Sequence, residues 1–99
     1  MMVKICGITN REDALAAVEA GASAIGFNFY RESSRFISHT GAATIAEKIP
    51  AGAVKVAESG IHSAKDIQRL TAAGYDAFLV GEHLMKSGDP ANALRALLS

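Results

Sequence analysis

A short apolar segment near the start of the chain ends in a thiol. Residues 3–9 read VKICGIT, so Cys6 closes a predicted strand and is followed by Gly7 and a helix start. In parallel sheets, functional groups gather where the strands end, and Cys6 lies at such an end. Cys6 is therefore either a catalytic thiol at the mouth of a barrel or a small apolar residue that fills a strand.

The overall composition excludes several classes of function. Ten basic and ten acidic side chains leave no net charge at pH 7, so the chain lacks the electrostatic footprint of a nucleic-acid or acidic-membrane binder. No apolar run approaches the roughly 20 residues that span a bilayer, and the first residues lack a signal-peptide pattern. One cysteine cannot form an internal disulfide, which favours the cytoplasm. The three histidines and the cysteine show no metal-ligand spacing, and nothing indicates a cofactor.

The elements that must position any site alternate along the chain. Strand-like segments at 3–6, 23–29, 54–59 and 77–81 are separated by helix-like segments at 9–21, 42–50 and 62–74, and a last helix follows 82–88. Such alternation calls for a parallel sheet covered by helices. The sequence predicts a single α/β domain over residues 1–99 with a (βα)4 arrangement and a four-stranded parallel sheet.

Helix boundaries carry recognisable signals. Thr9 and Glu12 have capping-box spacing, Gly21 is suited to the position just past a helix end, Ser63 is a predicted N-cap, and Asp89–Pro90 would open the last helix. Apolar residues recur at helical spacing within these segments: Leu15 and Val18 share a face; Ala42, Ile45, Ala46 and Ile49 form one stripe; Ile67 and Leu70 form another; and Leu94, Leu97 and Leu98 are apolar.

The chain also repeats itself at an offset of 53 residues. VKICGIT from Val3 aligns with VAESGIH from Val56, and EAGASAIGF corresponds to AAGYDAFLV. A repeat of this length indicates two copies of a βαβα unit, although A-G-x-x-A before a strand also recurs by chance in βα proteins. The equivalent pairs are Gly7 and Gly60, Ile8 and Ile61, Asp13 and Asp66, Gly21 and Gly74, and Ala24 and Ala77.

Each half of the chain resembles a known family. The run VKICGITNREDALAAVEAGASAIGFNFYRESSRFIS resembles the first two βα units of phosphoribosylanthranilate isomerase. The segments IPAGAVKVAESGI, AAGYDAFLVGEHLM and DPANALRALL resemble the last two βα units of indole-3-glycerol-phosphate synthase. Both families are (βα)8 barrels that act in tryptophan biosynthesis. The resemblance implies a half-barrel related to the TIM barrel, with an isomerase-like quarter at 1–50 and a synthase-like quarter at 51–99. Such a chain is an engineered chimera or a model of barrel evolution, and the alternative is a natural truncated gene product.

The isomerase resemblance implies roles for two residues. Cys6 matches the general base of an Amadori rearrangement, and Arg35 in YRESSRFIS matches the arginine that contacts the anthranilate carboxylate. The family also needs an aspartate as general acid, and no aspartate of this chain falls on the matching strand. The resemblance therefore implies that Cys6 is inherited but idle. The four aspartates lie in predicted helices, before a strand or at a cap: Asp13, Asp66, Asp76 and Asp89.

The synthase resemblance implies a phosphate site. Glu58 matches a glutamate that touches the substrate, whereas the family's main acid and base lie on strands that this chain lacks. Ser59, Gly60 and Gly81 lie in the two loops that hold the substrate phosphate with backbone N–H groups. Glu82 stands where many synthases have serine or threonine, and its carboxylate would repel a phosphate unless it turns outward.

Strand alternation bears on Glu58. If Cys6 faces the barrel interior, the repeat places Ser59 inside as well and turns Glu58 towards the helices, unless a bulge shifts the phase. Lys4 and Lys55 are predicted strand lysines, but their positions do not match the family's missing acid and base.

Three functions remain open at this stage. An isolated half-barrel leaves two sheet edges and one face uncovered, so a homodimer closing through these surfaces, with no efficient catalysis, is the first expectation. An alternative monomer places the synthase-like pair on the other side of the first strand. The second function is weak binding of phosphate or sugar phosphate, and the third is residual phosphoribosylanthranilate isomerase activity.

Overall fold

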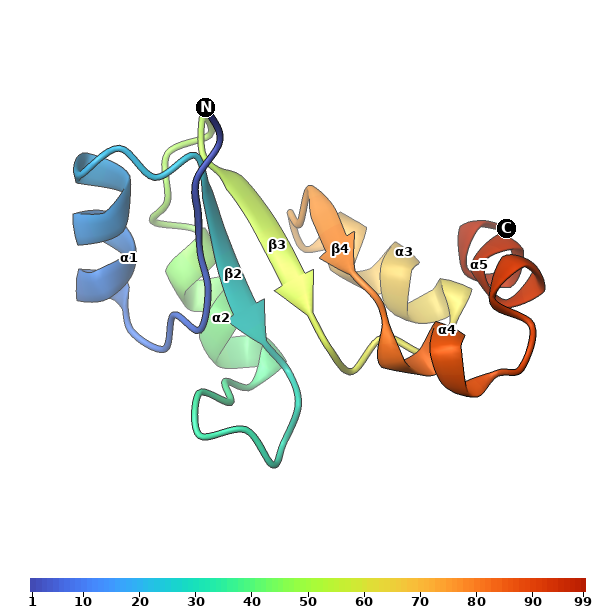
Figure 1. Ribbon diagram of the computed structural model, residues 1–99. Coiled ribbons are helices and arrows are strands. Elements are labelled where there is room, and N and C mark those ends of the chain that lie inside the picture. The colour runs from blue at the N-terminus through green and yellow to red at the C-terminus, as the bar shows by residue number, and fades with distance from the viewer.

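Four strands and five helices alternate along the chain (Figure 1). The computed structural model describes the backbone of residues 1–99 and all side chains except those of Glu82 and His83. The strands are β1 (Lys4–Ile5), β2 (Ala24–Asn28), β3 (Val54–Glu58) and β4 (Ala77–Leu79). The helices are α1 (Arg11–Glu19), α2 (His39–Ala46), α3 (Ala64–Ala72), α4 (Glu82–Lys86) and α5 (Pro90–Leu98).

The strands form one parallel sheet in the order β1-β2-β3-β4. This arrangement confirms the predicted (βα)4 half-barrel class. The alternative order, with the synthase-like pair beside the first strand, is wrong because β2 pairs directly with β3 along five residues. β1 and β4 are therefore the two edges of the sheet.

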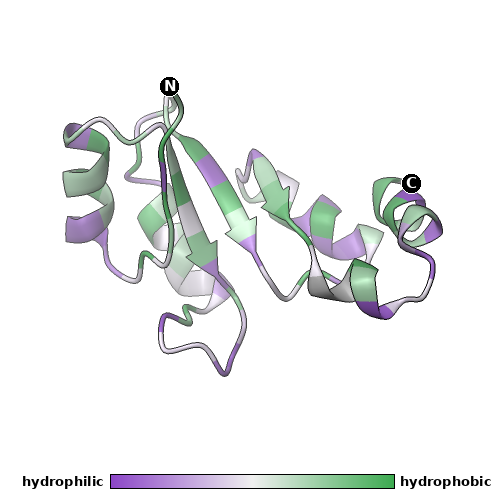
Figure 2. Cartoon of the chain, viewed as in Figure 1, coloured by the Kyte–Doolittle hydropathy of each residue, from purple (hydrophilic) through white to green (hydrophobic). Residues whose placement is uncertain are grey.

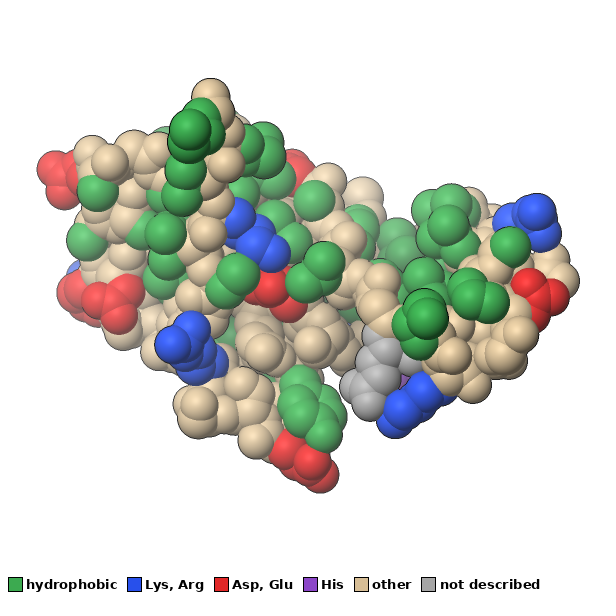
Figure 3. Space-filling model, in the orientation of Figure 1, with side chains coloured by type: hydrophobic (Ala, Val, Ile, Leu, Met, Phe, Trp, Pro, Cys, Tyr) green, Lys and Arg blue, Asp and Glu red, His purple; other side chains and the backbone are tan. Residues whose placement is uncertain are grey.

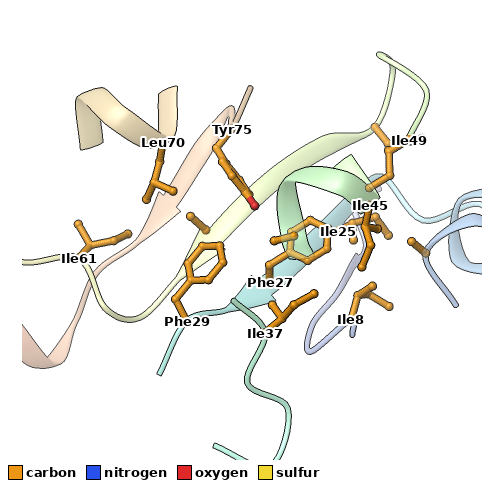
Figure 4. Close-up of a cluster of buried hydrophobic side chains, with 14 of the residues drawn as sticks. Ile8, Ile25, Phe27, Phe29, Ile37, Ile45, Ile49, Ile61, Leu70 and Tyr75 are labelled. Carbon is orange, nitrogen blue, oxygen red and sulfur yellow. The ribbon is translucent and has the colours of Figure 1, made fainter. Parts of the chain in front are cut away.

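The hydrophobic core lies between the sheet and its helices. Ile25 and Phe27 of β2 are fully buried and pack with Ile45 and Ile49 from the α2 region (Figure 4). Phe27 and Phe29 each meet the ring of Tyr75 edge-on, with ring centroids 6.0 and 5.8 Å apart. In the hydropathy colouring, β2 and β4 are largely green, and β3 has purple segments between green ones (Figure 2).

The other face of the sheet has no helix over it. Because side chains alternate along a strand, the neighbours of Ile25 and Phe27 in β2 point away from the helices, and the register extends this face across the sheet. Figure 1 shows the strands in front of α2 and α3 with this face towards the viewer. We call it the open face; it consists of Lys4, Ala24, Gly26, Asn28, Val54, Val56, Glu58, Ala77 and Leu79.

Most predicted boundary signals are confirmed. Ser63 caps α3, Asp89 caps α5 with Pro90 in the first turn, and Gly21 follows α1 with φ of 108°. Thr9 is wrong as the first cap: Asn10 takes this role because its Oδ1 accepts the N–H of Asp13 at 2.8 Å.

Most elements are shorter than predicted by one or more residues at an end, and three differences are larger. α2 begins at His39, earlier than predicted, because Ser38 caps it through the N–H of Gly41. The bridge at 82–88 contains a short helix, α4. β1 keeps only Lys4 and Ile5 of the predicted strand at 3–6.

Two further predictions bear on the whole chain. The division into quarters at residues 1–50 and 51–99 stays a prediction. Over the described residues, no helix combines the length and the apolar character needed to cross a bilayer.

Candidate functional site

A groove of ≈ 640 Å³ lies at the carboxyl ends of β3 and β4. Ser59 and Gly60 border it on the β3 side, and Gly81 borders it on the β4 side. The structure thus brings together three of the predicted phosphate-binding residues, although phosphate binding itself stays a prediction. The remaining lining residues are Tyr30, Ile61, His62, Leu79, Val80 and Lys86.

The backbone of the groove offers hydrogen-bond donors. The N–H groups of Ser59, Gly60 and Gly81 donate to no acceptor among the described residues. Ser59 and Gly60 both have left-handed backbone conformations, with φ of 64° and 69°. A Cβ on Gly60 would lie 3.3 Å from the carbonyl oxygen of Phe29, so the loop approaches β2 closely at this point.

Glu82 is the fourth predicted phosphate residue. The side chain of Glu82 lies outside the described residues. The backbone of Glu82 begins α4 directly after Gly81.

An ion pair occupies the middle of the open face. Lys4 Nζ of β1 lies 3.2 Å from Glu58 Oε2 of β3, and the pair spans the intervening strand at Gly26. A Cβ at Gly26 would overlap Glu58 Oε1, so only glycine lets this side chain cross β2. Figure 3 shows basic and acidic groups side by side near the centre of this face.

Glu58 is a buried acid with an incomplete set of partners. Its residue exposure is 8%, and its Oε1 has no hydrogen-bond partner among the described residues. Burial lowers the pKa of Lys4, but the hydrogen bond and charge of Glu58, with a smaller contribution from Cys6, together raise that pKa above its ordinary value. The ion pair therefore stabilises the protonated form of Lys4.

Glu58 points away from the helices. The repeat, combined with strand alternation from an inward-facing Cys6, predicted that Glu58 would point towards them. The register places Glu58 opposite Asn28 and Leu79 on the open face. The reason is the sheet register: it aligns Lys4 with Ala24 and Val54, whereas the repeat makes Lys4 equivalent to Ala57, which is buried in the helix-side core. The strands β1 and β3 therefore differ in phase already within the sheet.

Cys6 lies beside this ion pair. Its thiol is exposed, and its Cα is 3.5 Å from the position that a Cβ on Gly26 would occupy. No aspartate joins it among the described side chains: Asp13 and Asp66 lie in helical first turns, Asp76 accepts the N–H of Lys55, and Asp89 caps α5. The structure thus places a lysine and a glutamate, rather than an aspartate, near the thiol.

Arg35 lies over the loop that follows β1. A Cβ at Gly7, where φ is 70°, would overlap Arg35 Cδ and would lie 3.1 Å from its Nη1. The turn that carries Arg35 is held by its own backbone, since the N–H of Arg35 donates to Ser33 Oγ at 3.1 Å. Arg35 is exposed, and no carboxylate lies within ion-pair distance of it among the described side chains. Contact with a carboxylate stays a prediction.

Sequence reasoning missed the partnership of Lys4 with Glu58. The available signal was Gly26, a glycine inside the apolar strand AIGFN, because glycine in a strand often marks a close approach. Tyr30, His62 and Lys86 were also missed as groove residues. Within the described residues, no three His, Cys, Asp or Glu side chains are grouped to hold a metal ion.

Comparison with known proteins gives matches to both enzymes of the resemblance. The family model "Indole-3-glycerol phosphate synthase" matches residues 2–97. The synthase of Koribacter versatilis is 38% identical over 94 residues, covering 95% of this chain and 36% of the synthase. An N-(5'-phosphoribosyl)anthranilate isomerase of Nitratiruptor sp. is 60% identical over 50 residues, covering 50% of this chain and 26% of the isomerase.

Solved structures support the fold. Phosphoribosyl anthranilate isomerase from Thermotoga maritima aligns with a TM-score of 0.82 and 36% identity, covering 99% of this chain and 46% of that one. A mandelate oxidase aligns with a TM-score of 0.78 and 25% identity over 99% of this chain and 32% of the oxidase. This chain therefore spans less than half the length of these relatives. With 96 of its residues covered by one family model, the chain belongs to the indole-3-glycerol phosphate synthase family.

Proposed function

We propose that this 99-residue chain is a half-barrel unit that pairs with a second copy of itself and has no efficient catalysis of its own. The observation that supports the proposal is the sheet, whose edges β1 and β4 are unpaired and whose open face has no helix over it. Two four-stranded parallel sheets related by a twofold axis along the barrel can close eight strands without leaving an edge. The 46% coverage of the Thermotoga maritima isomerase fits two copies per barrel.

Apolar surfaces beside the two edges are complementary. An apolar groove of ≈ 280 Å³ lies beside β1 and α1, lined by Val3, Ile5, Ala17, Ala20, Gly21 and Ala22. Beyond β4, the helix α5 exposes Leu94 and Leu98, at 44% and 72%. Closure of the barrel brings α5 of one copy beside α1 of the other, since helices follow their strands around the outside. The leucines would then fill the groove.

The charged side chains of the open face are compatible with burial inside a closed barrel. Lys4 and Glu58 neutralise each other within one copy, so closure buries a pair rather than isolated charges. The other residues of the open face are small, apolar or, at Asn28, uncharged.

Sedimentation equilibrium over a wide concentration range tests the assembly. Leu79 is 54% exposed on β4, so Leu79→Lys should spare the fold of one copy while placing a charge in the interface. Leu15→Lys is the matched control, because Leu15 is exposed on α1 and does not line the groove beside β1. A concentration-dependent dimer that Leu79→Lys alone abolishes supports the proposal. A monomer at all concentrations refutes it.

We also infer that the chain is an engineered chimera of the two families. The 60% identity with an isomerase is confined to 50 residues, whereas the synthase family model extends over 2–97. A chimera predicts that the sequence identity between this chain and complete isomerases falls abruptly near residues 49–51. A gradual decline along the chain would contradict a chimera.

A second function, phosphate-ester binding, is favoured by the groove between β3 and β4. Ser59, Gly60 and Gly81 have N–H groups with no acceptor among the described residues, and such donors are suited to phosphate oxygens. One similar isomerase was solved in complex with reduced 1-(o-carboxyphenylamino)-1-deoxyribulose 5-phosphate, a phosphate ester.

Titration with inorganic phosphate, followed by amide NMR, tests this second function. The amides of Ser59, Gly60 and Gly81 should shift together. Gly81→Asp adds a carboxylate where a Cβ meets nothing within 4 Å, so it should abolish the shifts without disturbing the fold. Gly52→Asp is the control, since Gly52 also has free space but lies in the loop before β3. Equal shifts in both variants would exclude the groove.

Residual phosphoribosylanthranilate isomerase activity stays a prediction. Its test is Cys6→Ser, which should remove any turnover that the chain itself supports. Turnover that survives this change would come from a contaminating enzyme.

A further inference from the structure

We propose that Cys6 and Lys4 form a peroxide-sensitive pair, in which oxidation of the thiol leads to a reversible covalent S–N bond between the two side chains. The proposal goes beyond the assembly and the phosphate groove, because it assigns a modification site to the open face. The co-reactant that it requires is a hydroperoxide. It does not require a second copy of the chain.

Three reactive side chains converge at one position of the open face. Lys4 lies two residues before Cys6, so strand alternation brings both side chains to the same face. The Cα of Cys6 is 3.5 Å from the position that a Cβ on Gly26 would occupy. The Lys4–Glu58 ion pair crosses β2 at this same glycine. The thiol, the ammonium group and the carboxylate therefore meet beside the one residue of β2 that has no side chain.

The electrostatics of Lys4 also place it beside the thiol. Burial lowers the pKa of Lys4, whereas the hydrogen bond and charge of Glu58, followed by the charge of Cys6 and a side-chain hydrogen bond with it, raise that pKa above its ordinary value. Lys4 Nζ thus has two neighbours, the Cys6 thiol and Glu58 Oε2 at 3.2 Å. A nitrogen held next to a sulfur reacts with it far faster than a free amine in solution does.

Access and proton transfer are provided for as well. Cys6 is exposed, so a small peroxide can reach its sulfur. Glu58 is only 8% exposed, and its Oε1, which lies over Gly26, has no hydrogen-bond partner among the described residues. This carboxylate oxygen is a proton acceptor next to both reacting groups.

Two steps form the bond. In the first, the Cys6 thiolate attacks one oxygen of hydrogen peroxide and the O–O bond breaks. The sulfur is oxidised to a sulfenic acid, and the other oxygen leaves as water with the proton of the thiol. In the second, Lys4 Nζ passes one proton to Glu58 and attacks the sulfur. The S–O bond breaks as the S–N bond forms, and the hydroxyl group leaves as water with a second proton from Nζ.

Peptide mapping of the intact chain after treatment with hydrogen peroxide tests the proposal. The mass of the peptide 1–11 should fall by that of two hydrogen atoms, and trypsin should no longer cleave after Lys4. Dithiothreitol should reverse both changes, because a dithiol reduces the S–N bond. This reversal separates the bond from sulfoxides of Met1 and Met2 in the same peptide, which dithiothreitol does not restore.

Lys4→Arg is the decisive variant. It keeps a positive charge beside Glu58, but a guanidinium group does not give up its proton and is no nucleophile here. The bond should therefore be absent, and dimedone should trap Cys6 as a sulfenic acid. Lys55→Arg is the matched control, since Lys55 lies on the opposite face of β3 and should leave the yield of the bond unchanged.

Three results would overturn the proposal. A reversible loss of two hydrogen atoms that persists in Lys4→Arg would place the bond on a backbone nitrogen next to Cys6. A sulfenic acid that dimedone traps equally in the wild-type chain and in Lys4→Arg would show that Lys4 does not react. A disulfide between two chains, seen as a doubled mass without reductant, would show that Cys6 reacts with a second thiol instead.

Discussion

The two β-α-β units of the chain, β1-α1-β2 and β3-α3-β4, share their turns but not their strands. Asn10 and Ser63 are equivalent in the 53-residue repeat, and each caps a helix through the N–H of an aspartate three residues later. Gly7 and Gly60 have φ of 70° and 69°. Gly21 and Gly74, past the helix ends, have φ of 108° and 103°.

The strands depart from this symmetry. β1 has two residues where β3 has five, and Gly26 of β2 is equivalent to Leu79 of β4. Gly26 lets Glu58 cross to Lys4, whereas Leu79 leaves a large apolar side chain exposed at the edge. The repeat therefore preserves the conformations that turn the chain. The chemistry comes from positions where the two units differ.

The largest difference between the two units should be in the unfolding free energy that is lost when an equivalent core side chain is shortened. Phe27 is fully buried and its equivalent, Val80, is only partly buried against the same cluster. Phe27→Ala should cost about 4 kcal/mol of unfolding free energy, because it deletes a ring and leaves a cavity, and Val80→Ala about 1 kcal/mol. Urea unfolding at concentrations where single copies prevail checks both. Equal losses of unfolding free energy would contradict this account, because they would mean that Phe27 and Val80 contribute equally to the core.

The next effect concerns the open face. Gly26→Ala should cost about 2 kcal/mol, because the added methyl group displaces the Glu58 carboxylate from Lys4 and leaves both charges poorly paired. Leu79→Ala, at the equivalent position, should cost nearly nothing in a single copy. The double variant Lys4→Met/Gly26→Ala provides the control. If Gly26 acts through the ion pair, the double variant should lose less unfolding free energy than the sum of the losses of the two single variants. Full additivity would contradict this account of Gly26.

The helix caps should give smaller and equal losses. Asn10→Ala and Ser63→Ala each remove one side-chain acceptor for a first-turn N–H, which costs about 1 kcal/mol. Thr9→Ala is the control and should cost much less, since Thr9 does not cap α1. Thermal unfolding of the three variants decides the matter. A larger loss for Thr9→Ala than for Asn10→Ala would reverse the assignment of the cap.

The smallest effect concerns acid stability at α3. The His62 N–H donates to Asp66 Oδ2 at 2.9 Å, and this hydrogen bond, with Arg69 and Ser63, holds the pKa of Asp66 below its ordinary 3.8 despite partial burial. Since the folded pKa is the lower one, this stabilisation is fully present above the unfolded pKa and is lost as pH falls through the folded value.

Asp66→Asn should therefore cost about 0.5 kcal/mol at pH 6 and less at pH 3. Chemical unfolding of both proteins at the two pH values gives the comparison. A penalty that grows on acidification would show that the sign is wrong.

The sequence predicted the fold well because the strong signals are local. Ser63, Asp89 and Gly21 mark helix ends through their own backbone and side-chain chemistry, and the stripe of Ala42, Ile45, Ala46 and Ile49 is buried as expected. The prediction of Thr9 as the N-cap of α1 was wrong because Thr9 and Asn10 are adjacent and both are common capping residues. The hydrogen bond that Asn10 accepts from the Asp13 N–H fixes the start of the helix.

The site was less predictable because its contacts join distant segments. Lys4 and Glu58 meet only because β1, β2 and β3 are neighbours and Gly26 leaves room. Arg35 over Gly7 likewise depends on how the loop after β2 folds back towards β1. Neither contact has a short-range signal, whereas the groove residues Ser59, Gly60 and Gly81 follow strand ends and were brought together as predicted.

Amide hydrogen exchange at the two sheet edges tests the central claim, closure by a second copy, most directly. At low concentration the amides of β1 and β4 should exchange much faster than those of β2, because edge strands are open to water. At high concentration the edge amides should slow towards the rate of β2, and Leu79→Lys should prevent this slowing. Edge amides that exchange fast at every concentration, while β2 stays protected, would contradict the closed barrel.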